Sequence, residues 1–145
     1  MAIARPTTKT KISTTEWGWP VTDAVNLNTT DIAALKSATA VGAWVDFSFQ
    51  NGWINDPGTQ SCQYRKIGDI VYLRGRCKGG AISSVITTFP VGFRPPANID
   101  MTTVVYNNTT WIGAQTFMQA TGNLLAPTVP APLVLLNIAG QFSVI

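Results

Sequence analysis

Apolar and polar residues alternate through most of the chain after residue 40. The alternation is clearest on both sides of Gly68-Asp69, between Tyr64 and Cys77. A period of two predicts β-strands with one buried face, and a two-residue Gly-Asp link predicts a tight hairpin because glycine readily adopts positive φ. This hairpin pairs Ile67 with Ile70. Its expected core face carries Val71, Leu73, Gly75 and Cys77.

The whole region divides into short predicted strands separated by turn-forming residues. Pairs such as Asn51-Gly52, Pro57-Gly58 and Gly79-Gly80 recur about every ten residues, which is typical of an antiparallel β-sandwich. We therefore expect an all-β fold with a jelly-roll-like, antiparallel β-sandwich head. The predicted strands cover residues 44–49, 53–54, 62–67, 70–78, 82–89, 102–106, 110–118, 123–126, 133–138 and 141–145.

The first forty residues lack the alternation and predict a separate part of the chain. Residues 1–15 are polar, basic and rich in threonine, a composition that does not bury a core by itself. Such an extended arm usually becomes ordered on a partner, which favours an anchoring role. We expect residues 1–40 to anchor the chain and residues 41–145 to form the head domain.

One short helix is predicted in this N-terminal part, over residues 28–37. Thr29 or Thr30 can cap its N-terminus, and Ile32 and Leu35 share one face. Two turns of helix are not stable alone in water, so this helix must pack on the head or on other copies of the chain.

The composition is apolar and weakly charged. Apolar types make up 46% of the residues and charged types 12%, about half the share that is usual in soluble domains. Much of the surface must therefore be uncharged or covered by other subunits. The net charge is only +3 and no run of basic residues occurs, so nucleic acid is not an expected partner.

The basic residues fall mainly into two groups. One group, near the N-terminus, comprises Arg5, Lys9 and Lys11, and the other, on the central hairpin, comprises Arg65, Lys66, Arg74, Arg76 and Lys78. The hairpin group is either a solvated strand face or a contact with an acidic protein or an anionic cell-wall polymer. The sequence leaves both alternatives open.

Residues suited to catalysis are scarce. The chain contains no histidine, which removes the commonest general base and a usual zinc ligand. The acidic residues are spread along the chain, although Asp46 and Asp56 could meet as a pair of glycosidase carboxylates. We expect no enzyme activity, no cofactor and no metal site.

The two cysteines of the chain, Cys62 and Cys77, lie in the predicted strands of the central hairpin. The hairpin register places Cys62 opposite Gly75 and diagonal to Cys77, so a disulfide would need a small register shift or a bulge. The alternative is a pair of buried, reduced thiols, as expected for a chain that folds in a cytoplasm. The sequence does not decide between them.

The chain shows no pattern of export or membrane insertion. Its first twenty residues contain no apolar signal-peptide core, and no apolar run approaches the ~20 residues of a membrane span. We therefore expect a protein that folds in a cytoplasm and does not insert into a membrane.

Several turn motifs occur in a fixed order between residues 50 and 96. They are Asn51-Gly52-Trp53, the stretch from Tyr64 to Gly75, Gly79-Gly80, and the stretch from Ile86 to Pro96. Together they resemble the tail-fibre-type β-sandwich domain of tailed-bacteriophage and prophage virion proteins. Residues 120–124 and 135–140 extend the resemblance more weakly to the C-terminus. The resemblance implies a non-enzymatic virion structural protein that forms a homotrimer and is made in the bacterial host cytoplasm.

Two placements on the particle exterior follow from this resemblance. The favoured one is a capsid decoration or head-fibre protein, because a short chain with a basic arm suits attachment to a capsid lattice. The alternative is a tail-fibre or tail-tip component that contacts host-surface polysaccharide. A glycan-binding module without virion attachment, such as a bacteriocin, is a third interpretation.

The residues expected to perform these roles follow from their positions. Anchoring to capsid or tail proteins is assigned to Arg5, Lys9, Lys11, Trp17 and Trp19. Contacts within the trimer are assigned to Ile32 and Leu35. Contacts with a surface glycan are assigned to Trp53, Tyr106 and Trp111. These three aromatic residues lie near predicted loops and could instead belong to the core or to an interface.

Overall fold

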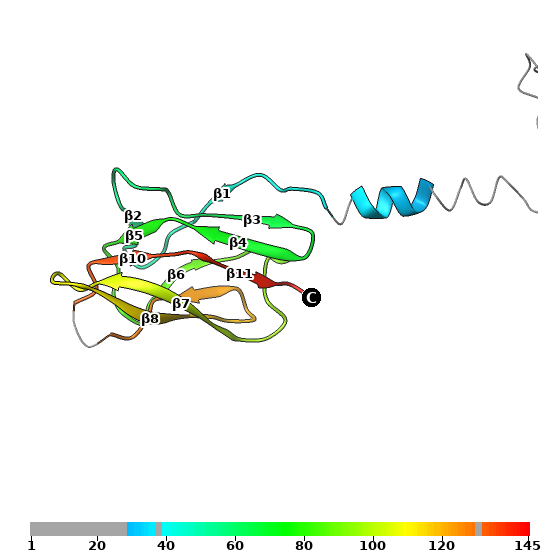
Figure 1. Cartoon of the computed structure of the whole chain (residues 1–145). Helices are drawn as coiled ribbons and strands as arrows, with labels where there is room; N and C mark the ends of the chain where they lie inside the picture. Colours follow the sequence, from blue (N-terminus) through cyan, green and yellow to red (C-terminus); the bar gives the residue numbers. More distant parts are fainter. Residues whose placement is uncertain (1–28, 37–38, 130–131) are drawn as a thin grey trace, which may run out of the picture. The chain divides into compact units, whose positions relative to one another are not determined.

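The computed structural model describes residues 29–36, 39–129 and 132–145. The chain divides into two units, Met1–Ser37 and Ala38–Ile145. The second unit is the head (Figure 1). The residues proposed for anchoring, Arg5, Lys9, Lys11, Trp17 and Trp19, lie outside the described residues.

Residues 29–36 form the short helix that the sequence predicts. Its residues are exposed, and Ile32 and Leu35 keep 52% and 65% of their surface open. Their part in a trimer stays a prediction. No described helix is long and apolar enough to cross a membrane.

The head consists of two antiparallel sheets, which confirms the predicted all-β sandwich (Figure 1). The smaller sheet has the strand order β1-β3-β4-β11. Its strands, in this order, are Val45–Asp46, Gln63–Ile67, Ile70–Arg74 and Gly140–Ser143. The larger sheet has the order β2-β5-β10-β7-β8-β9-β6. Its strands are Ile54–Asn55, Arg76–Lys78, Leu135–Asn137, Ile99–Tyr106, Trp111–Met118, Asn123–Leu125 and Val85–Thr88.

Side chains from both sheets form one buried apolar core. Val71 of β4 and Phe142 of β11 enter it from the smaller sheet. Val105 of β7 and Leu136 of β10 enter it from the larger sheet. Removal of this apolar surface from water is the main driving force that holds the two sheets together.

The central hairpin has the predicted register. Ile67 pairs with Ile70 across Gly68-Asp69, and Gly68 adopts a positive φ of 56°. Val71 and Leu73 of β4 are buried, as the alternation predicts. The turn residues and the apolar pattern specify the same arrangement here, so a prediction from local sequence succeeds.

The predicted strand 70–78 is two strands in the structure. β4 ends at Arg74 in the smaller sheet, and β5 begins at Arg76 in the larger sheet. Gly75 between them has a φ of 123°, and a Cβ on it would overlap the backbone of Cys62. Only glycine adopts this corner without strain. The prediction of a single strand was wrong at this residue.

The predicted strand 44–49 is also divided between the sheets. Val45 pairs with Tyr64 of β3 in the smaller sheet, whereas Phe49 forms a bridge with Thr87 of β6 in the larger sheet. Phe47 lies between these points and is buried, with its ring 5.5 Å from that of Phe89. The segment therefore passes from one sheet to the other instead of following one of them.

Cys62 and Cys77 are fully buried and free. The hydrogen bond with the Cys62 thiol, followed by burial, raises the pKa of the Cys77 thiol well above its ordinary value. The Cys77 thiol is therefore neutral and packs as a small apolar group. Of the two alternatives that the sequence left open, the structure has the reduced pair.

Gly75→Ala should lower the free energy of unfolding by about 3 kcal/mol or more, because a positive φ and an overlapping Cβ both strain the corner. Gly113→Ala in β8 is the matched control, since no atom lies within 4 Å of a Cβ added there. It should change the free energy of unfolding by less than about 1 kcal/mol. Urea unfolding followed by tryptophan fluorescence measures both variants. Equal effects would contradict the special role of Gly75.

Candidate ligand-binding surface

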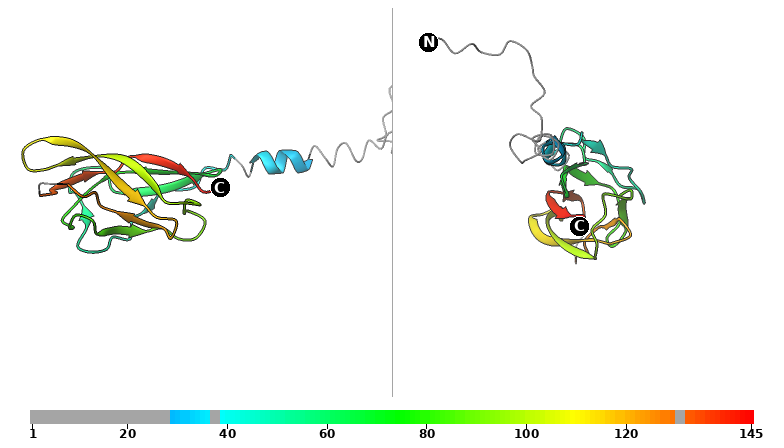
Figure 2. Two further views of the ribbon diagram at one scale, coloured as in Figure 1. Left: turned by 90° about the horizontal axis from the view of Figure 1, so that it is seen from below. Right: turned by 90° about the vertical axis from the view of Figure 1, so that its right-hand side faces the viewer.

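The two ends of the head differ in their connections. Val41 forms a bridge with Ile67, so the chain enters the head beside the β3–β4 turn. The C-terminus lies at the same end, where Val144 donates its N–H to the Asp69 carbonyl at 3.0 Å. The turn between β7 and β8, residues 107–110, lies at the opposite end (Figures 1 and 2). We call this opposite end the distal end.

Strand pairing places a row of side chains across the larger sheet at the distal end. Tyr106, the last residue of β7, pairs with Trp111 of β8 and with Leu135 of β10. Leu135 pairs in turn with Lys78 of β5. The residues next to this row along β5, β7 and β10 are buried. Because side chains alternate along a strand, the row itself faces outward.

Trp111 forms the centre of an exposed cluster on this face. Its side chain is 45% exposed, and its ring lies 5.3 Å from that of Tyr106. The guanidinium carbon of Arg76 lies 5.2 Å from the centre of the same indole. A guanidinium at this distance is attracted to the electron-rich ring face. We call Tyr106, Trp111 and Arg76 the Trp111 cluster.

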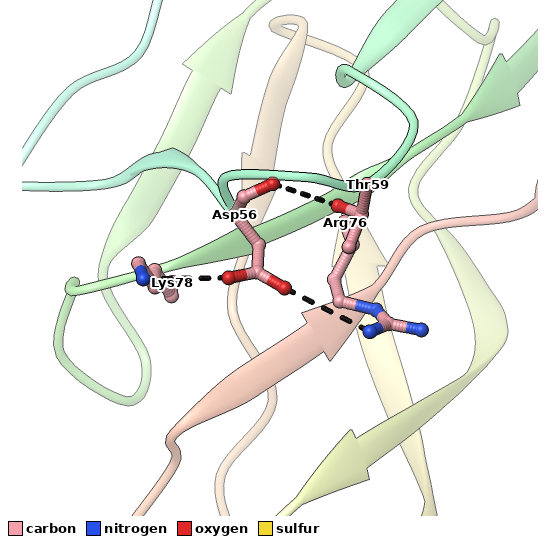
Figure 3. A network of polar contacts seen from close by, with 4 residues as sticks. All are labelled: Asp56, Thr59, Arg76 and Lys78. Atoms are coloured by element: carbon pink, nitrogen blue, oxygen red, sulfur yellow. Dashed lines mark hydrogen bonds and ion pairs between the residues drawn. The ribbon is translucent and has the colours of Figure 1, made fainter.

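One carboxylate orients the cations next to this cluster (Figure 3). Asp56 pairs through Oδ2 with Arg76 at 3.7 Å and through Oδ1 with Lys78 at 3.3 Å. The Asp56 backbone is fixed as well, because its carbonyl accepts a hydrogen bond from the Thr59 hydroxyl at 2.8 Å. Both cationic side chains are about one-third exposed, so these ion pairs add little stability. The Nε atom of Arg76 is buried and has no hydrogen-bond partner among the described residues.

The two carboxylates considered as a glycosidase pair have different partners. Asp56 binds Arg76 and Lys78, whereas Asp46 accepts a hydrogen bond from the Gln63 amide at 2.8 Å. Among the described residues, no group of three or more histidine, cysteine, aspartate or glutamate side chains could hold a metal ion. The chemistry available at the Trp111 cluster is aromatic stacking and hydrogen-bond donation, which suits ligand binding.

Trp53 belongs to the core, which corrects the prediction that it contacts a surface ligand. Its side chain is 2% exposed, and its Nε1 donates to the Ser84 hydroxyl at 2.9 Å. A Cβ on Gly80 would overlap the indole, so the Gly79-Gly80 turn lies directly against the ring. That pair of glycines was the sequence feature that could have identified Trp53 as buried. Of the three predicted contacts, Tyr106 and Trp111 remain at the surface.

Trp44 had no predicted role, yet it takes part in a second, partly buried group. The guanidinium carbons of Arg65 and Arg74 lie 4.5 Å and 3.8 Å from the centre of its ring. Trp44 is separated by an odd step from the apolar residues Phe47 and Phe49. That spacing was the available sign that Trp44 points away from the core.

No protein-family model and no curated protein matches the chain. Solved structures do match it. The receptor binding protein gp15 of Listeria phage PSA has 18% sequence identity and a TM-score of 0.61, and the match covers 92% of this chain and 86% of that one. The head domain of the lactococcal phage bIL170, described as a receptor-binding domain, has 16% identity and a TM-score of 0.55, with 72% and 99% covered.

The head has the fold of phage receptor-binding domains. This likeness confirms, at the level of the fold, the resemblance of residues 50–96 to tail-fibre-type phage domains. At these identities the likeness concerns the fold alone, so the ligand must be inferred from the residues on the surface of the head.

Trp53→Ala should lower the free energy of unfolding by about 3–5 kcal/mol, because it empties a buried space and leaves the Ser84 hydroxyl without its donor. Trp111→Ala should cost about 1 kcal/mol or less, since much of its ring is already in water. Each variant removes a tryptophan and so alters the fluorescence directly. Chemical denaturation is therefore followed by far-ultraviolet circular dichroism, which reports the loss of secondary structure. A similar loss in both variants would mean that Trp111 is structural.

Proposed function

We propose that this chain is a non-enzymatic virion protein of a tailed bacteriophage, and that its head attaches the particle to a glycan on the host surface. The observation that carries this proposal is the Trp111 cluster, an exposed tryptophan with a tyrosine and an oriented arginine. The likeness of the fold to proteins described as receptor-binding supports the same role.

The chemistry of the Trp111 cluster suits a sugar ligand. The flat indole face can stack on the C–H groups of a pyranose ring, and the removal of both surfaces from water favours this contact. The Tyr106 hydroxyl and the Arg76 guanidinium can bind hydroxyl or acidic substituents of the sugar. The Asp56 carboxylate, 3.7 Å from the Nη1 atom of Arg76, would keep the guanidinium near the ring and so lower the entropy cost of ordering it.

We place the protein at the tail, as a tail-fibre or tail-tip component, in preference to the capsid decoration or head-fibre role that the sequence favoured. The likeness to receptor-binding proteins supports this choice. The position of Tyr106 and Trp111 supports it too, because they lie toward the distal end, away from the point where the chain enters the head. A head that is held at its entry end would present these residues to the host.

The N-terminal part of the chain completes the proposed attachment. Ile32 and Leu35, which are exposed on the helix, would form contacts in a homotrimer. The basic and tryptophan residues of the arm would bind another virion protein. Burial of apolar helix faces in a trimer fits a chain that is 46% apolar and only 12% charged.

Trp111→Ala should weaken glycan binding tenfold or more, because stacking on the indole provides much of the contact. The full chain is first applied to an array of bacterial surface polysaccharides, and the affinity for the best ligand is then measured for each variant. Val91→Ala, at an exposed apolar position outside the cluster, is the control and should bind like the unmodified chain. Unchanged binding by Trp111→Ala would exclude the cluster, and no binding to any polysaccharide would contradict a glycan ligand.

Immunogold labelling of intact particles, with an antibody raised against the purified head, tests the placement. Gold particles at the end of the tail are the expected result, because the host is contacted there. Gold distributed over the capsid would contradict the tail placement and favour the decoration role. This result does not depend on which ligand the head binds.

A further inference from the structure

Gly113 is an unusual residue for its position in the larger sheet. It lies within the eight-residue strand β8. Glycine weakens a strand there, because it loses more backbone freedom on folding than other residues and offers no side chain to pack. A glycine inside a strand often marks a bulge, a tight bend or a surface that another molecule approaches closely. The structure around Gly113 separates these three explanations.

Neither a bulge nor a bend explains Gly113. β7 and β8 pair in continuous register along all eight residues of each strand, with Val104 opposite Gly113. The φ of Gly113 is not in the positive range that favours glycine. Apart from its own chain neighbours, no atom of the described residues lies within 4 Å of a Cβ added there. A larger residue would therefore fit without strain, which leaves the close approach of another molecule.

Gly113 lies next to the Trp111 cluster on the outer face of the larger sheet. Trp111 and Gly113 are two residues apart in β8, so they share this face at a separation of about 7 Å. Both residues are exposed. Their partners in β7 are Tyr106 and Val104, which lie beside them on the same face, and Val104 is 39% exposed. A molecule stacked on the indole therefore has open backbone next to it along β8.

The outward side chains next to Gly113 are uncharged and mostly polar. Asn137 of β10 pairs with Val104, and the next outward pair along β7 and β8 is Thr102 with Gln115. The two amide side chains offer hydrogen-bond donors and acceptors near the glycine. The edge of β8 is open here as well, because β9 pairs with β8 only from residue 117 onward.

We infer that Gly113 forms the floor of a second subsite, which holds the next sugar residue of a neutral glycan whose first residue stacks on Trp111. The inference rests on the proposed attachment to a host glycan, and adds to it the length, charge and direction of the bound segment. A sugar ring that lies flat on the Gly113 backbone places C–H groups against Val104, and removal of these surfaces from water favours the contact. The Asn137 and Gln115 amides can exchange hydrogen bonds with its hydroxyl groups.

A neutral sugar suits this subsite better than the other possible occupants. A charged group would lose hydration there without gaining an ion pair from the uncharged side chains around Gly113. A strand added by a second copy to the open edge of β8 would lie in the plane of the sheet and leave room for a side chain at residue 113. A protein packed on the face would gain most from an apolar centre, whereas Val104 adjoins Thr102 and Asn137.

The test uses fragments of one and two sugar residues, prepared from the neutral array polysaccharide that the full chain binds best. Gly113→Val fills the open space with a residue that strands favour, so the head should still fold. In isothermal titration calorimetry it should lower the affinity for the two-residue fragment about tenfold and leave that for the single sugar nearly unchanged. Ala120→Val adds similar bulk at an exposed residue after β8, and this control should bind both fragments like the unmodified chain.

Nuclear magnetic resonance of the unmodified chain locates the second sugar without any substitution. The single sugar should shift the indole N–H signal of Trp111, and the two-residue fragment should also shift the backbone N–H signal of Gly113. An unshifted Gly113 signal, or equal affinities for the two fragments, would overturn the subsite. A change in the sedimentation of Gly113→Val with unchanged fragment binding would overturn it too, because a second copy of the chain would then occupy this face.

The outcomes separate this inference from the proposed function. Loss of binding in Trp111→Ala with unchanged binding in Gly113→Val would overturn the subsite and leave the glycan proposal intact. Binding to charged polysaccharides alone, if Trp111→Ala loses it, would do the same. Loss in Gly113→Val with unchanged binding in Trp111→Ala would overturn the extension of the subsite from the Trp111 cluster. Absence of binding to every polysaccharide would overturn both proposals.

Discussion

The passage of the chain from one sheet to the other at Gly75 is the constraint on which the head depends. Before this residue, β4 pairs with β3 and β11, and after it β5 pairs with β2 and β10. The Gly75 carbonyl accepts a hydrogen bond from the Ile138 N–H at 2.8 Å, where the C-terminal part of the chain makes the same passage between β10 and β11. No side chain fits at Gly75, because it would overlap the backbone of Cys62. At this corner the two sheets are therefore joined by backbone contacts alone.

The same corner determines where the cationic side chains point. Alternation continues from Val71 to Cys77 without a break, so Arg74 and Arg76 both point outward although they lie in different sheets. Arg74 joins Trp44, and Arg76 joins Trp111. A basic stretch that looks like one strand face in the sequence thus contributes to two separate surfaces. Without the corner, both arginines would belong to one surface.

Local sequence order predicted the hairpin register, the short helix and the sandwich class, because turn residues and alternation agree there. It could not predict the corner, since alternation reports which face a residue occupies and not which sheet it joins. Sheet membership depends on hydrogen-bond partners far away in sequence. The tryptophans show the same limit of prediction from local sequence. Trp53 and Trp111 both adjoin turns, and only the contacts of Trp53 with Ser84 and the Gly80 turn make it a core residue.

The two tryptophan surfaces differ in how the cations beside the ring are paired. Arg76 and Lys78 share the single carboxylate of Asp56, which balances one of their two positive charges. Arg65 and Arg74 form no ion pair with a described carboxylate, and Arg74 is linked to Asp46 only through the side-chain amide of Gln63.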